Sequence, residues 1–208
     1  MLYLLTEDAN IDVLTRYLSR SLAEVYAPLG LISLNREVIA LTDIRWGPKF
    51  LAAERLGHSM AMVRHLVRAG KVDFPFGFYV APSGECHVLA PPIVEAYHSE
   101  DNILRYLILD GSHRCYAALT IAQSVSALVV SFKEEKVPLP CQPLLPSDVG
   151  IVETQPKLSA LFVDMSESAF RPVRGLMHKS YVFPSLDRAL LIFGLRKKLL
   201  IPFNLSVP

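Results

Sequence analysis

Residues 103–109, with the sequence ILRYLIL, form an almost continuous apolar run that ends at the turn dipeptide Asp110-Gly111. Such a run is typical of a strand that is buried on both faces. Residues 112–123 then favour a helix, and residues 126–132 favour a second strand. Because strand, tight turn, helix and strand follow in this order, we predict a βαβ unit with some parallel pairing.

The rest of the chain alternates helical and extended patterns, which predicts an α+β (α/β) fold with a mixed sheet and flanking helices. Apolar residues at helical spacing between residues 11 and 25 indicate an N-terminal helix. Residues 37–44 favour a strand. Two short helices follow in the prediction: residues 48–56, which Gly57 ends, and residues 59–69, which Ser59 caps and Gly70 ends.

A second extended region precedes the apolar run. Residues 74–82 favour a strand, and Ser83-Gly84 with the apolar residues 86–91 predict a hairpin. We predict that a surface loop follows this hairpin, at residues 92–102.

Four prolines between residues 138 and 146 mark a boundary or a rigid linker. We therefore predict a first domain at residues 1–137 and a C-terminal extension at residues 138–208. Within the extension we expect a strand at residues 159–165 and a closing helix from about Ser185.

The charges of the chain are balanced, with 21 Lys and Arg against 20 Asp and Glu, for a formal net charge of +1. This balance argues against a nucleic-acid partner but leaves a local basic patch open. The three cysteines lack CxxC spacing, which indicates free thiols in a reducing compartment. No secretory pattern is present, and no apolar run reaches the ~20 residues of a membrane span. We expect a cytoplasmic protein with no membrane partner, and a homodimer is left open.

The corner after residue 109 concentrates groups that suit a phosphate. Gly111 makes the turn and lets a ligand approach the backbone closely. Backbone N–H groups at a helix start, together with the helix dipole, favour anions. Ser112 can cap the helix or donate its hydroxyl, and Arg114 offers a planar fork that suits phosphate oxygens. We therefore take Gly111, Ser112, His113 and Arg114 as the phosphate-binding set.

Asp110 ends the strand, where ligands gather in open α/β sheets. Its carboxylate could hold Mg²⁺ or act as a base toward an acceptor hydroxyl. The structural alternative is a turn in which Asp110 and Ser112 are only caps. That alternative leaves Arg114 unexplained, because a cation is slightly unfavourable at a helix N-terminus.

The segment ILDGSHRCYAAL followed by SALVVSF resembles the ParB/sulfiredoxin superfamily, whose members carry Gly-x-His-Arg or Asp-Gly-x-His-Arg at a strand-to-helix corner. The resemblance covers residues 38–132 by pattern, although only five to eight residues are motif-grade. It implies a ParB/sulfiredoxin-like mixed sheet and nucleotide binding with phosphates on Gly111, Ser112, His113 and Arg114.

The form of the motif indicates which activities of that superfamily are expected here. Sulfiredoxins place a reactive cysteine directly before His-Arg, where this chain has Ser112, so sulfinic-acid repair is not expected. Chromosome-partitioning members have Gly-Glu-Arg-Arg and a helix-turn-helix domain, and neither is recognisable here. The form Asp-Gly-x-His-Arg looks closest to the ParB-like nuclease and free serine kinase type. Those kinases have an upstream glutamate that resembles a general base, and residues 42–57 offer only Asp43 and Glu54.

The resemblance therefore implies a catalytic set of Asp110, His113 and Glu54, with ATP or another nucleoside triphosphate, Mg²⁺ at Asp110, and a small-molecule acceptor. The expected function is an ATP-dependent phosphotransferase or NTPase. The alternative is a nucleotide- or DNA-associated regulator without turnover.

Three other features have both a structural and a functional interpretation. His58 is interpreted as a surface residue in a loop that could instead contact a ligand. Trp46 is interpreted as a packing residue that could instead stack on a base. A basic cluster near the C-terminus is more often a solvated face than a binding surface; it comprises Arg171, Arg174, His178 and Lys179.

Overall fold

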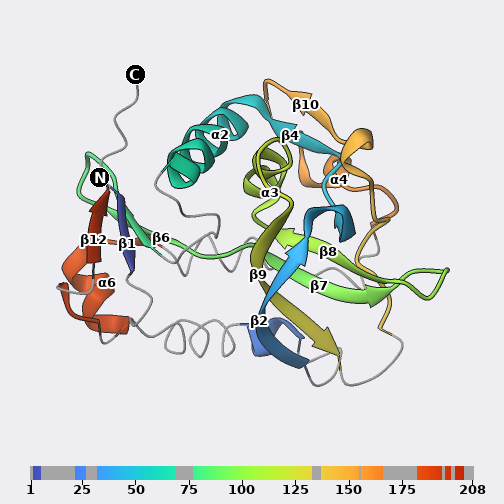
Figure 1. Ribbon diagram of the computed structural model, residues 1–208, viewed down its shortest axis with the longest axis horizontal. Coiled ribbons are helices and arrows are strands. Elements are labelled where there is room, and N and C mark those ends of the chain that lie inside the picture. The colour runs from blue at the N-terminus through green and yellow to red at the C-terminus, as the bar shows by residue number, and fades with distance from the viewer. Residues whose placement is uncertain are drawn as a thin grey trace.

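A five-stranded mixed sheet forms the centre of the structure, a computed structural model (Figure 1). Its strand order is β2-β9-β7-β8-β3. The pairs β2–β9 and β7–β8 are antiparallel, whereas β7–β9 and β3–β8 are parallel. The strands are β2 (Ile32–Ala40), β3 (Ile44–Trp46), β7 (Ile93–His98), β8 (Leu104–Asp110) and β9 (Ser124–Phe132).

The structure describes residues 2–5, 22–26, 32–68, 77–132, 137–154, 156–165, 182–193, 195–197 and 200–203. Helices and strands are mixed in this part of the chain, so the predicted α+β class is confirmed. None of the helices in these ranges is both long and apolar enough to cross a membrane. Most of the predicted N-terminal helix and the whole basic cluster at residues 171–179 lie outside the described residues; residues 22–26 are helical.

Both faces of the central sheet are covered, as the apolar run 103–109 predicts. Along β9, Val125, Ala127 and Val129 belong to one buried cluster, whereas Leu128 and Val130 belong to another. Alternate residues of a strand point to opposite faces, so each face has its own core. The first core lies under α2 (Ala53–Arg68) and α3 (Ser112–Ala118). The second includes the helical residues 22–26 and α6 (Leu186–Phe193).

Some parallel pairing is present, in β7–β9 and β3–β8, but the predicted βαβ unit is wrong. Strands β8 and β9 are separated by β7, which is antiparallel to β8 and parallel to β9, so β8 and β9 run in opposite directions. Helix α3 has seven residues and ends at Ala118. It is about 10 Å long, whereas seven residues of strand span about 23 Å. The helix is therefore too short to return the chain to the start of β8.

One helix replaces the two that were predicted after residue 48. Strand β4 (Phe50–Ala52) leads directly into α2, which has 16 residues and contains Gly57 and Ser59 in its interior. A glycine inside a helix costs about 1 kcal/mol relative to alanine. The buried side chains Leu56, Val63 and Leu66 offset this cost by packing into the first core.

The loop predicted at residues 92–102 is also wrong, because residues 93–98 form β7 and pair with β8. Ile93 and Val94 are fully buried. Glu95 is buried as well, and it accepts a hydrogen bond from the Tyr26 hydroxyl at 3.0 Å. A strand buried in this way is hard to recognise when a buried carboxylate interrupts its apolar pattern.

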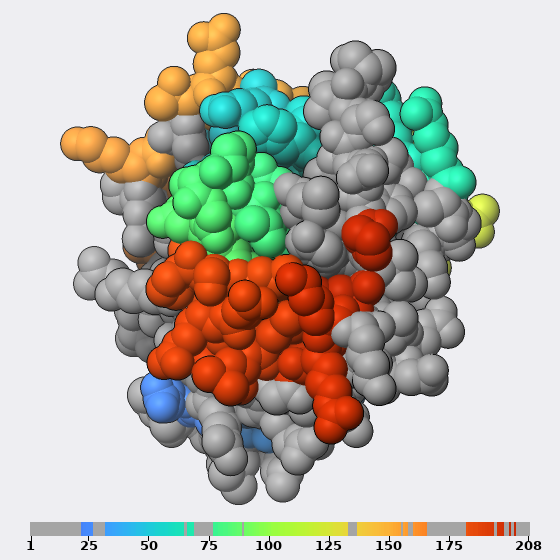
Figure 2. All heavy atoms as spheres, turned by 90° about the vertical axis from the view of Figure 1, so that its left-hand side faces the viewer, coloured from blue at the N-terminus to red at the C-terminus, as the bar shows by residue number. Residues whose placement is uncertain are grey.

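A second sheet has the order β11-β6-β5-β1-β12. The predicted hairpin at Ser83-Gly84 is confirmed by the antiparallel pair β5 (Gly77–Val80) and β6 (Cys86–Leu89). In Figure 2 the orange-red α6 lies beside the green β5–β6 hairpin, and the rings of Phe78 and Phe193 are 6.0 Å apart. The remaining strands are β1 (Leu2–Leu5), β11 (Val182–Phe183) and β12 (Leu200–Phe203).

The part of the chain after residue 138 contributes strands to sheets that also contain earlier strands. Strand β10 (Gly150–Val152) pairs with β4, β11 pairs with β6, and β12 pairs with β1. The division into residues 1–137 and 138–208 stays a prediction. The strand predicted at residues 159–165 is wrong, because α4 (Leu158–Leu161) occupies its first half. The closing helix is confirmed as α6.

Candidate functional site

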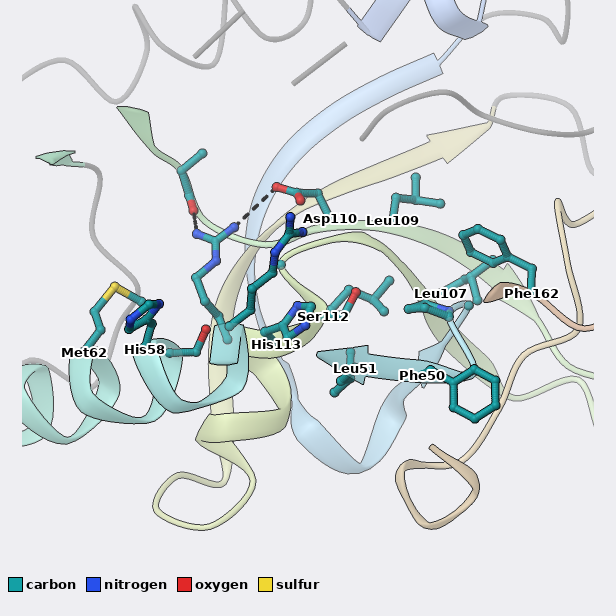
Figure 3. A pocket seen from close by; sticks show the side chains of 18 of the residues that line it. Phe50, Leu51, His58, Met62, Leu107, Leu109, Asp110, Ser112, His113 and Phe162 are labelled. Carbon is teal, nitrogen blue, oxygen red and sulfur yellow. Dashed lines mark hydrogen bonds and ion pairs between the residues drawn. The ribbon is translucent and has the colours of Figure 1, made fainter. Parts of the chain in front are cut away.

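A cavity of about 610 Å³ opens beside the corner between β8 and α3 (Figure 3). Its lining comes from four places: the end of β8 with the first turn of α3, one face of α2, the β5–β6 hairpin, and residues around Phe50, Cys141 and Phe162. In Figure 3, His58 and Met62 lie on one side, Phe50, Leu107 and Phe162 lie on the other, and Ser112 and His113 lie between them. All five corner residues, 110–114, line this cavity.

Gly111 makes the corner, as predicted from the sequence. It is the N-cap residue of α3 and has φ 88° and ψ 16°, in the left-handed region. A Cβ at this position would lie 3.0 Å from Arg114 Nη2 and 3.1 Å from Pro92 Cα. Both the conformation and the space therefore demand glycine.

The Arg114 side chain binds two protein acceptors. Its Nη2 lies 3.4 Å from Oδ2 of Asp110, and its Nη1 donates to the backbone carbonyl of Ala90. The side chains of Arg114 and Asp110 are only 15% and 26% exposed. The ion pair explains how a cation is tolerated in the first turn of α3, because the adjacent carboxylate neutralises it. Arg114 thus has a structural role in addition to its place on the cavity wall.

His113 connects α3 to the junction of β4 and α2. The backbone N–H of Ala52 donates to Nε2 of His113 at 3.1 Å. A ring nitrogen that accepts a hydrogen bond carries no proton, so the proton of a neutral His113 resides on Nδ1. In this arrangement Nε2 is not available as a general base toward a ligand.

Ser112 and Trp46 meet at the back of the corner. Ser112 lines the cavity, and its carbonyl lies 3.4 Å from Trp46 Nε1. Trp46 is fully buried and packs edge-on against Tyr116, with ring centroids 6.1 Å apart. The packing interpretation of Trp46 is confirmed, and a buried ring has no free face for a base.

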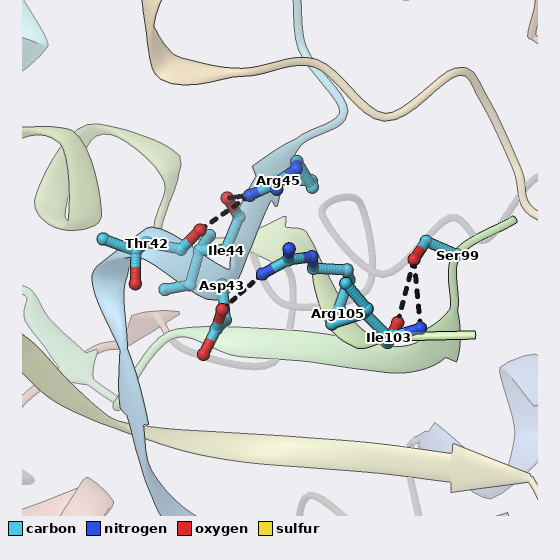
Figure 4. Close-up of polar contacts among 7 residues, drawn as sticks. All are labelled: Thr42, Asp43, Ile44, Arg45, Ser99, Ile103 and Arg105. Atoms are coloured by element: carbon cyan, nitrogen blue, oxygen red, sulfur yellow. Dashed lines mark hydrogen bonds and ion pairs between the residues drawn. The ribbon is translucent and has the colours of Figure 1, made fainter. Parts of the chain in front are cut away.

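Neither upstream carboxylate lines the cavity. Glu54 is in the first turn of α2 and is exposed to solvent. Asp43 accepts a hydrogen bond from Arg105 on β8 (Figure 4). Asp110 is the one acidic residue among the described residues of the cavity wall. The part of the chain that the structure describes contains no group of three or more His, Cys, Asp or Glu residues placed to hold a metal ion.

One face of α2 supplies four site residues, of which the sequence interpretation considered only His58 as a possible ligand contact. Arg55, His58, Ser59 and Met62 all line the cavity, at the spacing i, i+3, i+4 and i+7 of a single helical face. His58 is therefore a helical residue of the cavity wall rather than part of a loop. The periodicity was present in the sequence, but placing a helix end at Gly57 divided these four residues between two elements.

Burial suppresses the reactivity of Cys115. The side chain is fully buried directly after the corner. Burial raises the pKa of the Cys115 thiol to about 12, Arg114 lowers it and Asp110 raises it. The thiol is therefore protonated at neutral pH and is no nucleophile.

Comparisons with protein-family models, with curated proteins and with solved structures give no match to this chain. The resemblance to the ParB/sulfiredoxin superfamily therefore depends on the corner motif and its position between strand and helix.

Proposed function

We propose that the cavity binds a nucleotide, ATP or another nucleoside triphosphate, with its phosphates at the corner of residues 111–114, as in a ParB/sulfiredoxin-type protein. The observation that carries this proposal is that two helices bring cations and hydroxyls to one space. Arg55 and Ser59 come from α2, and Ser112 and Arg114 come from α3. Guanidinium groups and hydroxyls are the side chains that bind phosphate oxygens most effectively.

The charges around the cavity favour an anion. Among its described lining residues, two are arginines and one is the aspartate already paired with Arg114. Arg55 therefore adds a positive charge that no acidic residue of the wall balances. The volume of about 610 Å³ falls within the ~300–1,000 Å³ range of small-molecule sites, so a nucleoside can accompany the phosphates.

Three ring-bearing residues of the lining suit a nucleoside. His58 comes from α2, Tyr79 and His87 come from the β5–β6 hairpin, and the rings of Tyr79 and His87 are 6.1 Å apart. Aromatic and imidazole rings offer both stacking surfaces and hydrogen-bonding groups to a base. Figure 3 places His58 on the same side of the cavity as Met62.

Magnesium fits this site only together with phosphates. Mg²⁺ is commonly held by one or two carboxylates plus the phosphates of a substrate. Asp110 offers one carboxylate to the cavity. When bound, the ion would neutralise phosphate charge beside Asp110. Arg114 would then exchange its contact with Asp110 for one with a phosphate oxygen.

Binding without turnover is the form of this function that the geometry supports best. Of the three expected catalytic residues, His113 uses Nε2 in a backbone contact, Glu54 faces solvent outside the cavity, and Asp110 is paired with Arg114. Phosphoryl transfer to a hydroxyl acceptor is the second candidate. It is favoured by the position of Asp110, whose carboxylate would become available if a phosphate drew Arg114 away.

Isothermal titration of the full chain with ATP, CTP and ADP, each with Mg²⁺, tests the proposal. Saturable binding of at least one nucleotide supports it, and binding of none overturns it. Measuring phosphate release from the nucleotide that binds distinguishes binding without turnover from phosphoryl transfer or hydrolysis. Turnover that is lost in Asp110→Asn would favour the phosphotransferase or NTPase over the regulator.

A further inference from the structure

The wall of the cavity opposite His58 is apolar. Phe50, Leu107, Pro140, Cys141 and Phe162 line it, and they come from β4, from β8 and from the chain after residue 138. A Cβ on Gly47 would lie 3.1 Å from Cys141 Sγ and 3.4 Å from a ring carbon of Phe162, so both side chains converge on Gly47. Figure 3 shows Phe50, Leu107 and Phe162 together on this side, away from His58 and Met62. These five residues are called the apolar wall below.

The apolar wall offers no charged group to a ligand. The Lys49 ammonium lies 5.5 Å from the centroid of the Phe50 ring. Lys49 itself is exposed and does not line the cavity. The apolar wall and the corner share strand β8, on which Leu107 precedes Asp110 by three residues, or about 10 Å.

We propose that the apolar wall binds a second, uncharged small molecule that has an aromatic or branched aliphatic body and a hydroxyl group. The inference rests on the proposed function for the place of the phosphates, at the corner beside the apolar wall. We therefore expect the second ligand, which binds beside the nucleotide, to be a neutral alcohol and not a free amino acid. The body of the alcohol packs against Phe50 and Phe162, which leaves its hydroxyl near Asp110.

A free amino acid lacks partners at this wall. Its ammonium group needs an anion, and the five residues of the apolar wall include none. Its carboxylate needs a cation, and both arginines of the cavity lie on the helices that face the phosphates. Charges that are buried without partners are strongly unfavourable, whereas an apolar body gains by leaving water.

Ligand-observed NMR on the full chain, with benzyl alcohol and L-serine as probes, tests this inference. We expect benzyl alcohol to bind saturably and L-serine not to bind. Phe162→Ala and Phe50→Ala should each weaken the binding of benzyl alcohol about fivefold to tenfold, because each removes a ring from the apolar wall. Leu191→Ala, at an exposed apolar residue of α6 that does not line the cavity, is the control and should change it less than twofold.

Two variants are used so that poor folding of one, detected by circular dichroism, still leaves the other. Binding of L-serine in preference to benzyl alcohol would overturn the inference, and so would benzyl alcohol binding that neither phenylalanine variant weakens. The titration with ATP is read separately. If benzyl alcohol binds at Phe50 and Phe162 but no nucleotide binds, the apolar site stands and the nucleotide proposal fails. If ATP binds and benzyl alcohol does not, the inference about the apolar wall alone fails.

Discussion

The guanidinium of Arg114 reaches back across the Gly111 turn to the carboxylate of Asp110, with Nη2 3.4 Å from Oδ2. The two side chains expected to act on a ligand are therefore partners of each other. Each neutralises the charge of the other in the corner, which reduces the cost of holding both half-buried. A phosphate that enters the cavity would compete with Asp110 for Arg114, so ligand binding and the state of this ion pair are linked.

The conformation of Gly111 predicts a large effect of an added methyl group. Its φ of 88° disfavours any side chain, and a Cβ would lie 3.0 Å from Arg114 Nη2. We expect Gly111→Ala to lower the free energy of unfolding by about 2 kcal/mol or more, from the left-handed conformation and the close contacts together. Urea denaturation followed by circular dichroism measures this change.

Gly57→Ala is the matched control, because Gly57 lies inside α2 and a Cβ there meets nothing within 4 Å. We expect this variant to be as stable as the wild type or more stable by up to about 1 kcal/mol. Equal stabilities for Gly111→Ala and the wild type would show that the corner does not have the geometry described.

His113 predicts a stability change that is independent of any ligand. Removing its ring leaves the N–H of Ala52, a residue that is 6% exposed, without its acceptor. An unsatisfied buried donor costs about 1–3 kcal/mol. We expect His113→Ala to lower the free energy of unfolding by this amount in the absence of nucleotide. An unchanged free energy of unfolding would contradict the hydrogen bond from the Ala52 N–H to His113.

The part of the site that the sequence predicts is the part built from neighbouring residues. The strand 104–110, the Gly111 turn and the start of α3 follow one another in the chain, and local patterns identify all three. The acceptor that fixes Arg114 is the carbonyl of Ala90, 24 residues away. No local pattern encodes that contact, because it depends on how β6 and β8 are brought together.

The elements that were missed share a physical cause, namely that tertiary packing outweighed a local signal. Gly57 is a helix end by its propensity, yet α2 continues through it because Leu56 and Val63 pack into the core. Residues 93–98 resemble a loop because Pro91-Pro92 precede them and Glu95 is charged, yet pairing with β8 and β9 makes them a central strand. The first error divided the α2 face of the cavity between two elements. The second left out a strand of the buried core.

The raised pKa of Cys115 predicts how stability changes in alkali. Burial raises the pKa of this thiol from 9.0 to about 12. Its contribution to the free energy of unfolding is therefore fully present below pH 9 and is lost as the pH rises from 9 toward 12. In that window the unfolded thiol ionises and the folded thiol does not, which removes up to about 1.4 kcal/mol per pH unit.

Denaturation of the wild type and Cys115→Ala between pH 8 and pH 10.5 isolates this contribution. Because the other titrating groups are common to both proteins, the variant should lose stability less steeply above pH 9. Parallel profiles would contradict the burial of the thiol. Alkylation by iodoacetamide at pH 8 should also be slow at Cys115 in the folded protein and fast after unfolding.

Trp46 is the only tryptophan of the chain and is fully buried behind the corner. We therefore predict a blue-shifted emission maximum and weak quenching by acrylamide in the folded protein. Because its Nε1 lies 3.4 Å from the Ser112 carbonyl, a nucleotide at the corner should change the emission intensity without altering acrylamide access. Strong quenching that a nucleotide suppresses would instead indicate a ring stacked on a base.

The affinity for ATP of Arg55→Ala, compared with that of Arg64→Ala, tests the central claim most directly. Both arginines are exposed residues of α2, but only Arg55 lines the cavity. Losing a hydrogen bond to a charged group costs about 1.5–3 kcal/mol, so Arg55→Ala should bind ATP roughly 10- to 100-fold more weakly by isothermal titration. Arg64→Ala should bind like the wild type. Equal losses in the two variants, or none in Arg55→Ala, would contradict nucleotide binding in this cavity.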